Sequence, residues 1–234
     1  MRRSWSIAGW TLVLMGVLAL ELLTRPAQAE WYVAGQGGGN FPDSLSSVNV
    51  LDPSTRFPSG VTSSELLLHN SVMYGAKVGY YFDQLPWLGV EMEAFHSTPH
   101  VKQQDVTLTR DNATIASGAI SGQDLRVTNW APINVVVRYQ KMGPLEPYAG
   151  IGLGVFFAHI HDAGSGASAS DNLKPGLNTQ VGLRWRITKN LSLFGEWKYN
   201  HASLHFDHST PTGAIGAEST YRTHIAAGGI GWHF

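Results

Sequence analysis

Apolar and polar residues alternate with period two along most of the chain after residue 29. Between residues 72 and 82 the even positions are apolar, and the odd positions include Gly75, Lys77 and Gly79. This alternation is typical of a strand with one apolar and one polar face. It recurs at residues 88–94, 133–139, 148–157, 177–187, 191–200 and 226–234, and a glycine-interrupted version lies at 31–39. The pattern therefore predicts eight strands.

The connections between these segments differ in length and composition. Three are short and carry Pro, Gly or Asn, as tight turns do: residues 83–86, 141–146 and 189–190. Four are long and rich in Gly, Ser and Thr: residues 39–70, 97–123, 161–173 and 204–220. A closed eight-stranded barrel with both chain ends on one side of a membrane has this arrangement. We therefore expect an all-β fold, an eight-stranded antiparallel transmembrane barrel of the outer-membrane type.

The first 29 residues have the composition of a secretory signal. Arg2 and Arg3 precede an apolar run over residues 7–23, and Ala27-Gln28-Ala29 is a small-x-small cleavage motif. An uncleaved anchor helix is the alternative, against which Glu21 and the cleavage motif argue. We expect a signal peptide over residues 1–29 and a barrel domain over residues 30–234.

Composition indicates which face of the predicted sheet points outward. A soluble barrel that carries a ligand would also alternate with period two, but its exterior would be dense in Lys and Glu. Here charged residues make up 14% of the chain, against roughly 25% in soluble domains. The polar face is glycine-rich, and aromatic residues lie towards the strand ends, as in an interfacial girdle. We therefore expect the apolar face to contact lipid. The net charge of −1 gives no electrostatic basis for binding nucleic acid, and the chain has no cysteine.

Eight charged residues lie on the predicted inner face. They are Lys77, Glu91, Glu93, Arg138, Arg184, Arg186, Glu196 and Lys198. An eight-stranded barrel is only wide enough inside for side chains, and an unpaired buried charge is costly. We expect Lys77 to pair with Glu91 or Glu93, and Arg184 and Arg186 to pair with Glu196. Such pairs would plug the lumen; a narrow, low-conductance ion path is the functional alternative.

Nine of the ten histidines lie in the predicted long loops or at the strand ends next to them. Neutral imidazole binds Zn, Cu or Ni, and alternate positions project from one face of a strand. The candidate metal ligands on this basis are His159, His161, His205 and His208. The alternatives are rim residues in the headgroup region and a pH-sensitive loop cluster. We expect neither a metal nor a cofactor.

Two segments near the C-terminus resemble a known family. The chain ends in Ile230-Gly231-Trp232-His233-Phe234, a strand that closes on an aromatic residue, and residues 191–201 resemble a penultimate strand. The whole predicted mature chain is similar to the OmpA/OmpX/Opa-like small barrels of the bacterial outer membrane. This resemblance implies that Trp232 and Phe234 form the signal read by the outer-membrane assembly machinery. It further implies a monomer that contacts outer-membrane lipid and lipopolysaccharide and whose loops bind an unknown extracellular ligand.

One motif also resembles the PagL-like lipid A deacylases, in which a His-x-Ser pair works with a glutamate. His201 and Ser203 match the pair, with Glu218 as the carboxylate. A nucleophilic serine needs a base within hydrogen-bond reach and a group that orients the base. Leu204 stands where that family has Asn, and the spacing to Glu218 departs from its pattern. We expect a structural or surface-interaction barrel rather than an enzyme, with the channel and the hydrolase as alternatives.

Overall fold

The described chain consists of strands and the connections between them. The computed structural model describes residues 30–51, 60–120, 122, 124–161, 168–210 and 213–234, so the predicted signal peptide lies outside this part. Within it, no helix is long and apolar enough to cross a membrane. The strands are β1 (Glu30–Pro42), β2 (Ser46–Leu51), β3 (Thr62–Ser63), β4 (Ser71–Tyr81), β5 (Leu88–Ser97), β6 (Gln104–Arg110), β7 (Ala113–Ile120), β8 (Asp124–Arg138), β9 (Leu145–His161), β10 (Ser168–Arg186), β11 (Leu191–Thr210) and β12 (Gly213–His233).

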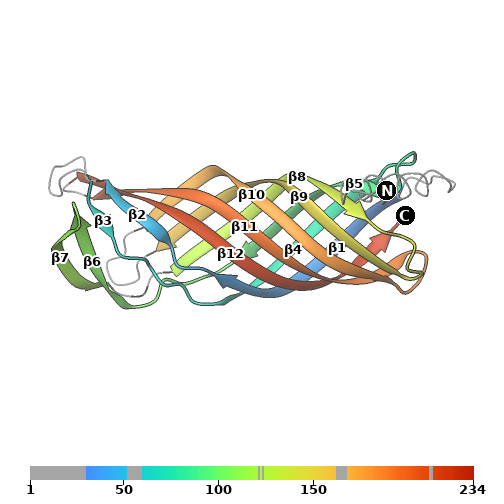
Figure 1. Ribbon diagram of the computed structural model, residues 1–234, viewed down its shortest axis with the longest axis horizontal. Helices are drawn as coiled ribbons and strands as arrows, with labels where there is room; N and C mark the ends of the chain where they lie inside the picture. The colour runs from blue at the N-terminus through green and yellow to red at the C-terminus, as the bar shows by residue number, and fades with distance from the viewer. Residues whose placement is uncertain (1–29, 52–59, 121, 123, 162–167, 211–212) are drawn as a thin grey trace, which may run out of the picture.

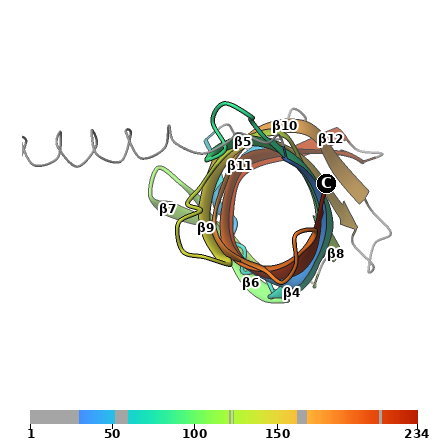
Figure 2. The same ribbon diagram turned by 90° about the vertical axis from the view of Figure 1, so that its right-hand side faces the viewer.

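Eight of these strands close into a barrel. Their order is β1-β4-β5-β8-β9-β10-β11-β12, all neighbours are antiparallel, and β12 pairs back onto β1 from Tyr32–His233 to Pro42–Thr223. Figure 2 shows the closed ring, and Figure 1 places both ends of the described barrel at the end with the short turns. Hydrocarbon cannot satisfy a free strand edge, so this last pairing is required for a sheet that spans a membrane. The predicted fold class is confirmed.

Side chains alternate between lipid and lumen as predicted. On β11, Leu193 and Trp197 are exposed, whereas Glu196 and Lys198 are buried. Exposed aromatic residues gather near the short-turn end at Trp31, Tyr139, Trp185, Trp232 and Phe234, and again further along the strands at Phe41, Tyr74, Trp130 and Trp197. Two such belts mark the two membrane interfaces of an outer-membrane barrel. The predicted outward direction of the apolar face is confirmed.

Two of the predicted long loops are largely strand. β9 and β10 remain paired as far as His161–Ser168, and β11 and β12 as far as Thr210–Gly213. The loops predicted at residues 161–173 and 204–220 are therefore wrong over most of their length; residues 162–167 and 211–212 lie outside the described part. Beyond the hydrocarbon neither face of a strand must be apolar, so the period-two signal disappears while the backbone pairing continues.

The other two long connections, 39–70 and 97–123, contain a small sheet. β2 pairs with β12 from Thr220–Ser46 to Gly216–Leu51, beyond the point where β1 leaves β12, and the order continues as β2-β3-β6-β7. The β6–β7 hairpin turns at Asp111 and Asn112, whose φ angles of 49° and 64° suit a two-residue hairpin turn. We call β2, β3, β6 and β7 the extracellular sheet; Figure 1 shows them at the end opposite the termini.

An apolar core covers the extracellular end of the lumen. Apolar inward-facing residues of the barrel cluster there, and residues from the two structured loops pack onto them: Leu45, Leu68, Val101, Leu125, Val127, Phe156, Ala158, Ala202, Leu204 and Tyr221. Backbone bonds fix the loops in place, including Leu45 N to Leu66 O at 2.8 Å and Lys102 N to Leu67 O at 2.9 Å. The loops are therefore continuous with the barrel core.

Glycines on the inner face of β9 make room for large lumen side chains. A Cβ on Gly152 would lie 2.1 Å from Asn134 Oδ1 and 2.3 Å from the backbone oxygen of Ile133. Gly195 is the opposite case, because a Cβ there meets no atom within 4 Å. The two glycines therefore differ in the space around them.

We predict that Gly152→Ala lowers the free energy of unfolding by about 1–3 kcal/mol, the usual cost of overpacking. Gly195→Ala, the matched control, should leave it unchanged or raise it slightly. Urea unfolding of the refolded protein in detergent micelles, followed by tryptophan fluorescence, measures both. Equal values for the two variants would contradict the close packing at Gly152.

Candidate functional site

The lumen is filled by layers of side chains. Along β11 the inward residues, counted from the short-turn end, are Ser192, Phe194, Glu196, Lys198 and Asn200, all buried. The charged side chains of the lumen form two clusters. The central cluster comprises Lys77, Glu91, Glu93, Glu196 and Lys198, and the end cluster comprises Glu30, Arg138, Glu146, Arg184, Arg186 and His233.

The central cluster crosses the lumen. Nζ of Lys77, on β4, lies 2.8 Å from Oε2 of Glu196 on β11 and 3.6 Å from Oε1 of Glu91 on β5. Lys198 pairs with Glu93 and lies 3.1 Å from Glu196 Oε1. The five side chains are at most 2% exposed, so the charges are almost fully removed from water. Such ions are stable only when they are paired and hydrogen-bonded.

Neutral donors complete the central cluster, in which three carboxylates face two ammonium groups. The Tyr32 hydroxyl and Gln180 Nε2 both donate to Glu91, the latter at 2.8 Å. Tyr148 donates to Glu196 at 2.7 Å. Gln36 donates to Glu93 at 2.5 Å. Each carboxylate therefore has at least one neutral donor besides a lysine, and none of these donors could be identified from the sequence pattern.

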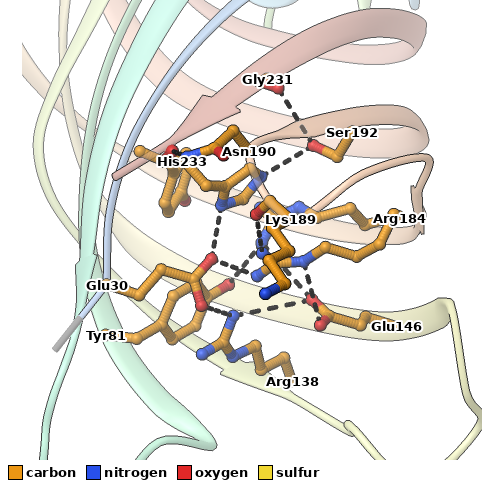
Figure 3. Close-up of polar contacts among 12 residues, drawn as sticks. Glu30, Tyr81, Arg138, Glu146, Arg184, Lys189, Asn190, Ser192, Gly231 and His233 are labelled. Atoms are coloured by element: carbon orange, nitrogen blue, oxygen red, sulfur yellow. Dashed lines mark hydrogen bonds and ion pairs between the residues drawn. The ribbon is translucent and has the colours of Figure 1, made fainter. Parts of the chain in front are cut away.

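The end cluster lies next to the short turns (Figure 3). Arg138 Nη1 is 2.7 Å from Glu30 Oε2, and Arg186 Nε is 3.2 Å from Glu146 Oε1. Arg186 also pairs with Glu30, and Arg184 lies 3.9 Å from Glu146. Three guanidinium groups thus share two carboxylates, giving an excess of one positive charge that matches the excess negative charge of the central cluster.

The predicted pairing of Arg184 and Arg186 with Glu196 is wrong. Arg184 lies opposite Phe194 in the β10–β11 register and opposite Glu146 in the β9–β10 register. An aromatic layer separates the two clusters, since the Arg184 guanidinium lies 4.6 Å from the ring centre of Tyr32 and 5.2 Å from that of Tyr148. Glu146, assigned to a turn, and Glu30, which precedes the first predicted strand, were missed as partners.

A chain of hydrogen bonds in the end cluster joins three strands across the barrel seam. Ser192 Oγ on β11 lies 2.8 Å from His233 Nε2 on β12, and His233 Nδ1 bonds Glu30 on β1. The order of serine, histidine and carboxylate is that of a hydrolytic triad. However, Ser192 and His233 are at most 1% exposed, and Glu30 is already paired with two arginines. These hydrogen bonds therefore link the first and the last strands of the barrel.

The sequence-predicted catalytic residues do not form such a chain. His201 and Ser203 face outward on β11, as predicted, but no hydrogen bond joins them within the described residues. Glu218 lies opposite His205 in the β11–β12 register. The side chains of Glu218 and His205 lie outside the described part, so the third group of this motif has no described contact with Ser203.

The other predicted positions lie apart from the two clusters. His159 is exposed on β9, and the side chains of His161 and His208 lie outside the described part. Among the described residues no three His, Asp or Glu side chains are grouped to hold a metal ion. Trp232 and Phe234, the predicted assembly signal, are exposed to lipid at the short-turn end, where Phe234 N donates to Trp31 O at 2.9 Å.

A closed barrel with an apolar exterior, aromatic belts and an ionic interior defines an integral outer-membrane protein. The chain belongs to the outer membrane protein beta-barrel domain family, whose model matches residues 11–234, and it is located in the bacterial outer membrane. It is similar in structure to OprG from Pseudomonas aeruginosa (TM-score 0.62, 13% identity, 89% of this chain and 97% of that chain covered). It is also similar to Neisserial surface protein A (TM-score 0.53, 12% identity, 88% and 99% covered). At these identities the likeness concerns the fold alone. No curated protein sequence matches the chain.

We predict that Lys77→Met lowers the free energy of unfolding by about 3–5 kcal/mol, because it leaves buried carboxylates without their cation. The double variant Lys77→Met/Glu196→Gln should recover part of this loss, since one uncompensated charge is removed with the lysine. Lys189→Met, in an exposed turn, is the control and should change the value by no more than about 0.5 kcal/mol. Urea unfolding in micelles measures all three, and a Lys77→Met value near that of the control would contradict the buried pairing.

We also predict that neither hydroxyl is catalytic. Mass spectra of lipid A from cells that express the wild type, Ser192→Ala or Ser203→Ala should show the same number of acyl chains. Ser192→Ala should lower the free energy of unfolding by about 1 kcal/mol through its lost hydrogen bond, whereas Ser203→Ala should not. An acyl chain removed by the wild type and retained with either variant would identify that serine as a nucleophile.

Proposed function

We propose that the protein is a monomeric surface-interaction barrel, whose membrane-spanning part is a closed anchor and whose extracellular sheet carries the specificity. The observation that carries this proposal is the division of the molecule into a side-chain-filled lumen and an exposed sheet that is rigidly attached to it. The lumen contains two charged clusters, an aromatic layer between them and the apolar core at the extracellular end. This filling argues against a continuous water path for ions.

The extracellular sheet has the properties of a binding surface. Seven of the eight residues of β7 are exposed, including Ile115 at 45%, and of this strand only Ile120 packs against the apolar core. Its position is nevertheless fixed, because β6 pairs with β3 and a cross-strand bond of 2.9 Å links Thr62 to Thr109. Exposed segments held by a rigid scaffold are the usual location of binding residues.

Replacement of residues 104–120 by a short Gly-Ser linker tests the proposal. We expect the variant to fold and to keep its shift between boiled and unboiled gel samples, because the barrel strands are untouched. In lipid nanodiscs, the wild type should bind at least one member of an array of extracellular-matrix proteins and glycans, and the variant should lose that binding. The absence of any wild-type binding, or equal binding by the variant, would contradict the proposal.

A planar-bilayer recording separates the closed anchor from the channel alternative. We expect no steady conductance from the wild type, because every layer of the lumen is occupied by side chains. A reproducible conductance of the wild type would show that the barrel is a narrow channel and not a closed anchor, whatever the array experiment shows.

A further inference from the structure

A trough of small residues crosses the lipid-facing wall of the barrel. Gly35 on β1, Ala76 on β4 and Ala94 on β5 are paired in register, and all three are exposed. At either end of this row of paired residues stands a large side chain: Ile230 on β12 lies opposite Gly35, and Trp130 on β8 lies opposite Ala94. Large residues therefore flank three adjacent small ones.

The trough is a shallow apolar depression, largely open to its surroundings. It has a volume of about 640 Å³, and its lining includes Val33, Val78, Met92 and Trp232 as well as the row itself. This volume lies within the usual range for small-molecule sites, about 300–1,000 Å³. Because the barrel is located in the outer membrane, acyl chains surround this wall.

Polar groups lie just beyond the trough on the extracellular side. His96 and Thr128 are the next outward positions above Ala94 and Trp130, and His96 Nδ1 lies 2.8 Å from Thr128 Oγ1. The ring of Tyr74 lies 5.6 Å from that of His96. Arg126 is the next outward residue on β8 and is exposed, and no described acidic group pairs with it. The wall thus carries hydrogen-bonding groups and a cation directly above an apolar trough.

We infer that this wall binds one molecule of a phosphorylated outer-leaflet glycolipid, with an acyl chain in the trough and its anionic head group near Arg126. The order of the groups along the membrane normal carries the assignment, because an amphiphile of the outer leaflet has its phosphate outermost and its acyl chains inward. A guanidinium is a strong hydrogen-bond donor to phosphate. The trough holds the apolar acyl chain of the glycolipid, and Arg126 pairs with its anionic head group.

A second copy of the chain fits this site less well than a lipid. The outer surface of a barrel is convex, so a neighbouring barrel would rest on Trp130 and Ile230 without reaching the floor at Ala76. It would also bring a second Arg126 instead of an anion. A single flexible acyl chain can reach the floor of the trough, and it brings no second Arg126.

Native mass spectrometry of the detergent-solubilised protein, with added hexa-acylated lipid A as the probe, tests the inference. The wild type should retain one lipid A per chain. Ala94→Leu fills the trough, and Arg126→Gln removes the charge; each should lower the retained fraction about tenfold, the effect expected from losing one good apolar or charge-assisted contact. Two control variants make comparable changes elsewhere: Ala149→Leu, exposed on β9, and Lys189→Gln, exposed in the short turn between β10 and β11. Both should behave as the wild type does.

Three outcomes would overturn the inference. They are equal retention by Ala94→Leu and Ala149→Leu, equal retention by Arg126→Gln and Lys189→Gln, and a dimer in place of bound lipid A that is lost with Ala94→Leu. Gel mobility before and after boiling verifies the folding of each variant. Ala76→Leu, which fills the same trough from the neighbouring strand, takes the place of Ala94→Leu if that variant does not fold.

Discussion

The structure depends on one constraint, the closure of β12 onto β1. Within hydrocarbon each backbone N–H and C=O must find a partner in the sheet, and a barrel with an open seam would expose two unsatisfied edges. The pairing from Tyr32–His233 to Pro42–Thr223 removes both edges. Side chains reinforce the seam from within, because His233 on the last strand joins Glu30 on the first and Ser192 on the neighbouring strand. The residues that complete the backbone ladder thus also complete the ionic interior.

Closure creates a narrow lumen, and the charges in it follow from that narrowness. Five carboxylates and five lysine or arginine side chains occupy the two clusters, so the filled interior carries no net charge apart from His233. Charge is not balanced within each cluster, and in the central cluster neutral tyrosine hydroxyls donate hydrogen bonds to two of the three carboxylates. Tyr32 donates to Glu91 and lies beneath the Arg184 guanidinium, so it contacts one cluster with its hydroxyl and the other with its ring. The aromatic layer therefore joins the clusters as well as separating them.

The sequence predicted the wall of the barrel well and its interior only in outline. Period-two alternation depends on local geometry, so it assigned Leu193 and Lys198 to opposite faces without knowledge of the tertiary structure. Cross-lumen pairing depends on the stagger of the strands, which alternation does not contain, and so Arg184 was assigned to Glu196 when it contacts Glu146. Pro132 shows a related limit. It lies in a register irregularity that interrupts the apolar pattern, and β8 extends beyond it to Asp124.

The same reasoning explains why the extracellular half could not be predicted. Above the membrane, β11 and β12 continue as a paired ribbon in which apolar and polar residues no longer alternate along the sequence, because water is then available to both faces. The pattern that identifies a strand in lipid is thus absent where the strands leave it. The apolar core at the barrel mouth, with Leu45 and Val101 from the loops, lies between this region and the ionic clusters. Because that core buries loop and barrel residues together, exposed positions on β6 and β7 can change in sequence without disturbing the charges below. Selection for a binding surface and selection for a stable anchor can therefore act on separate parts of the chain.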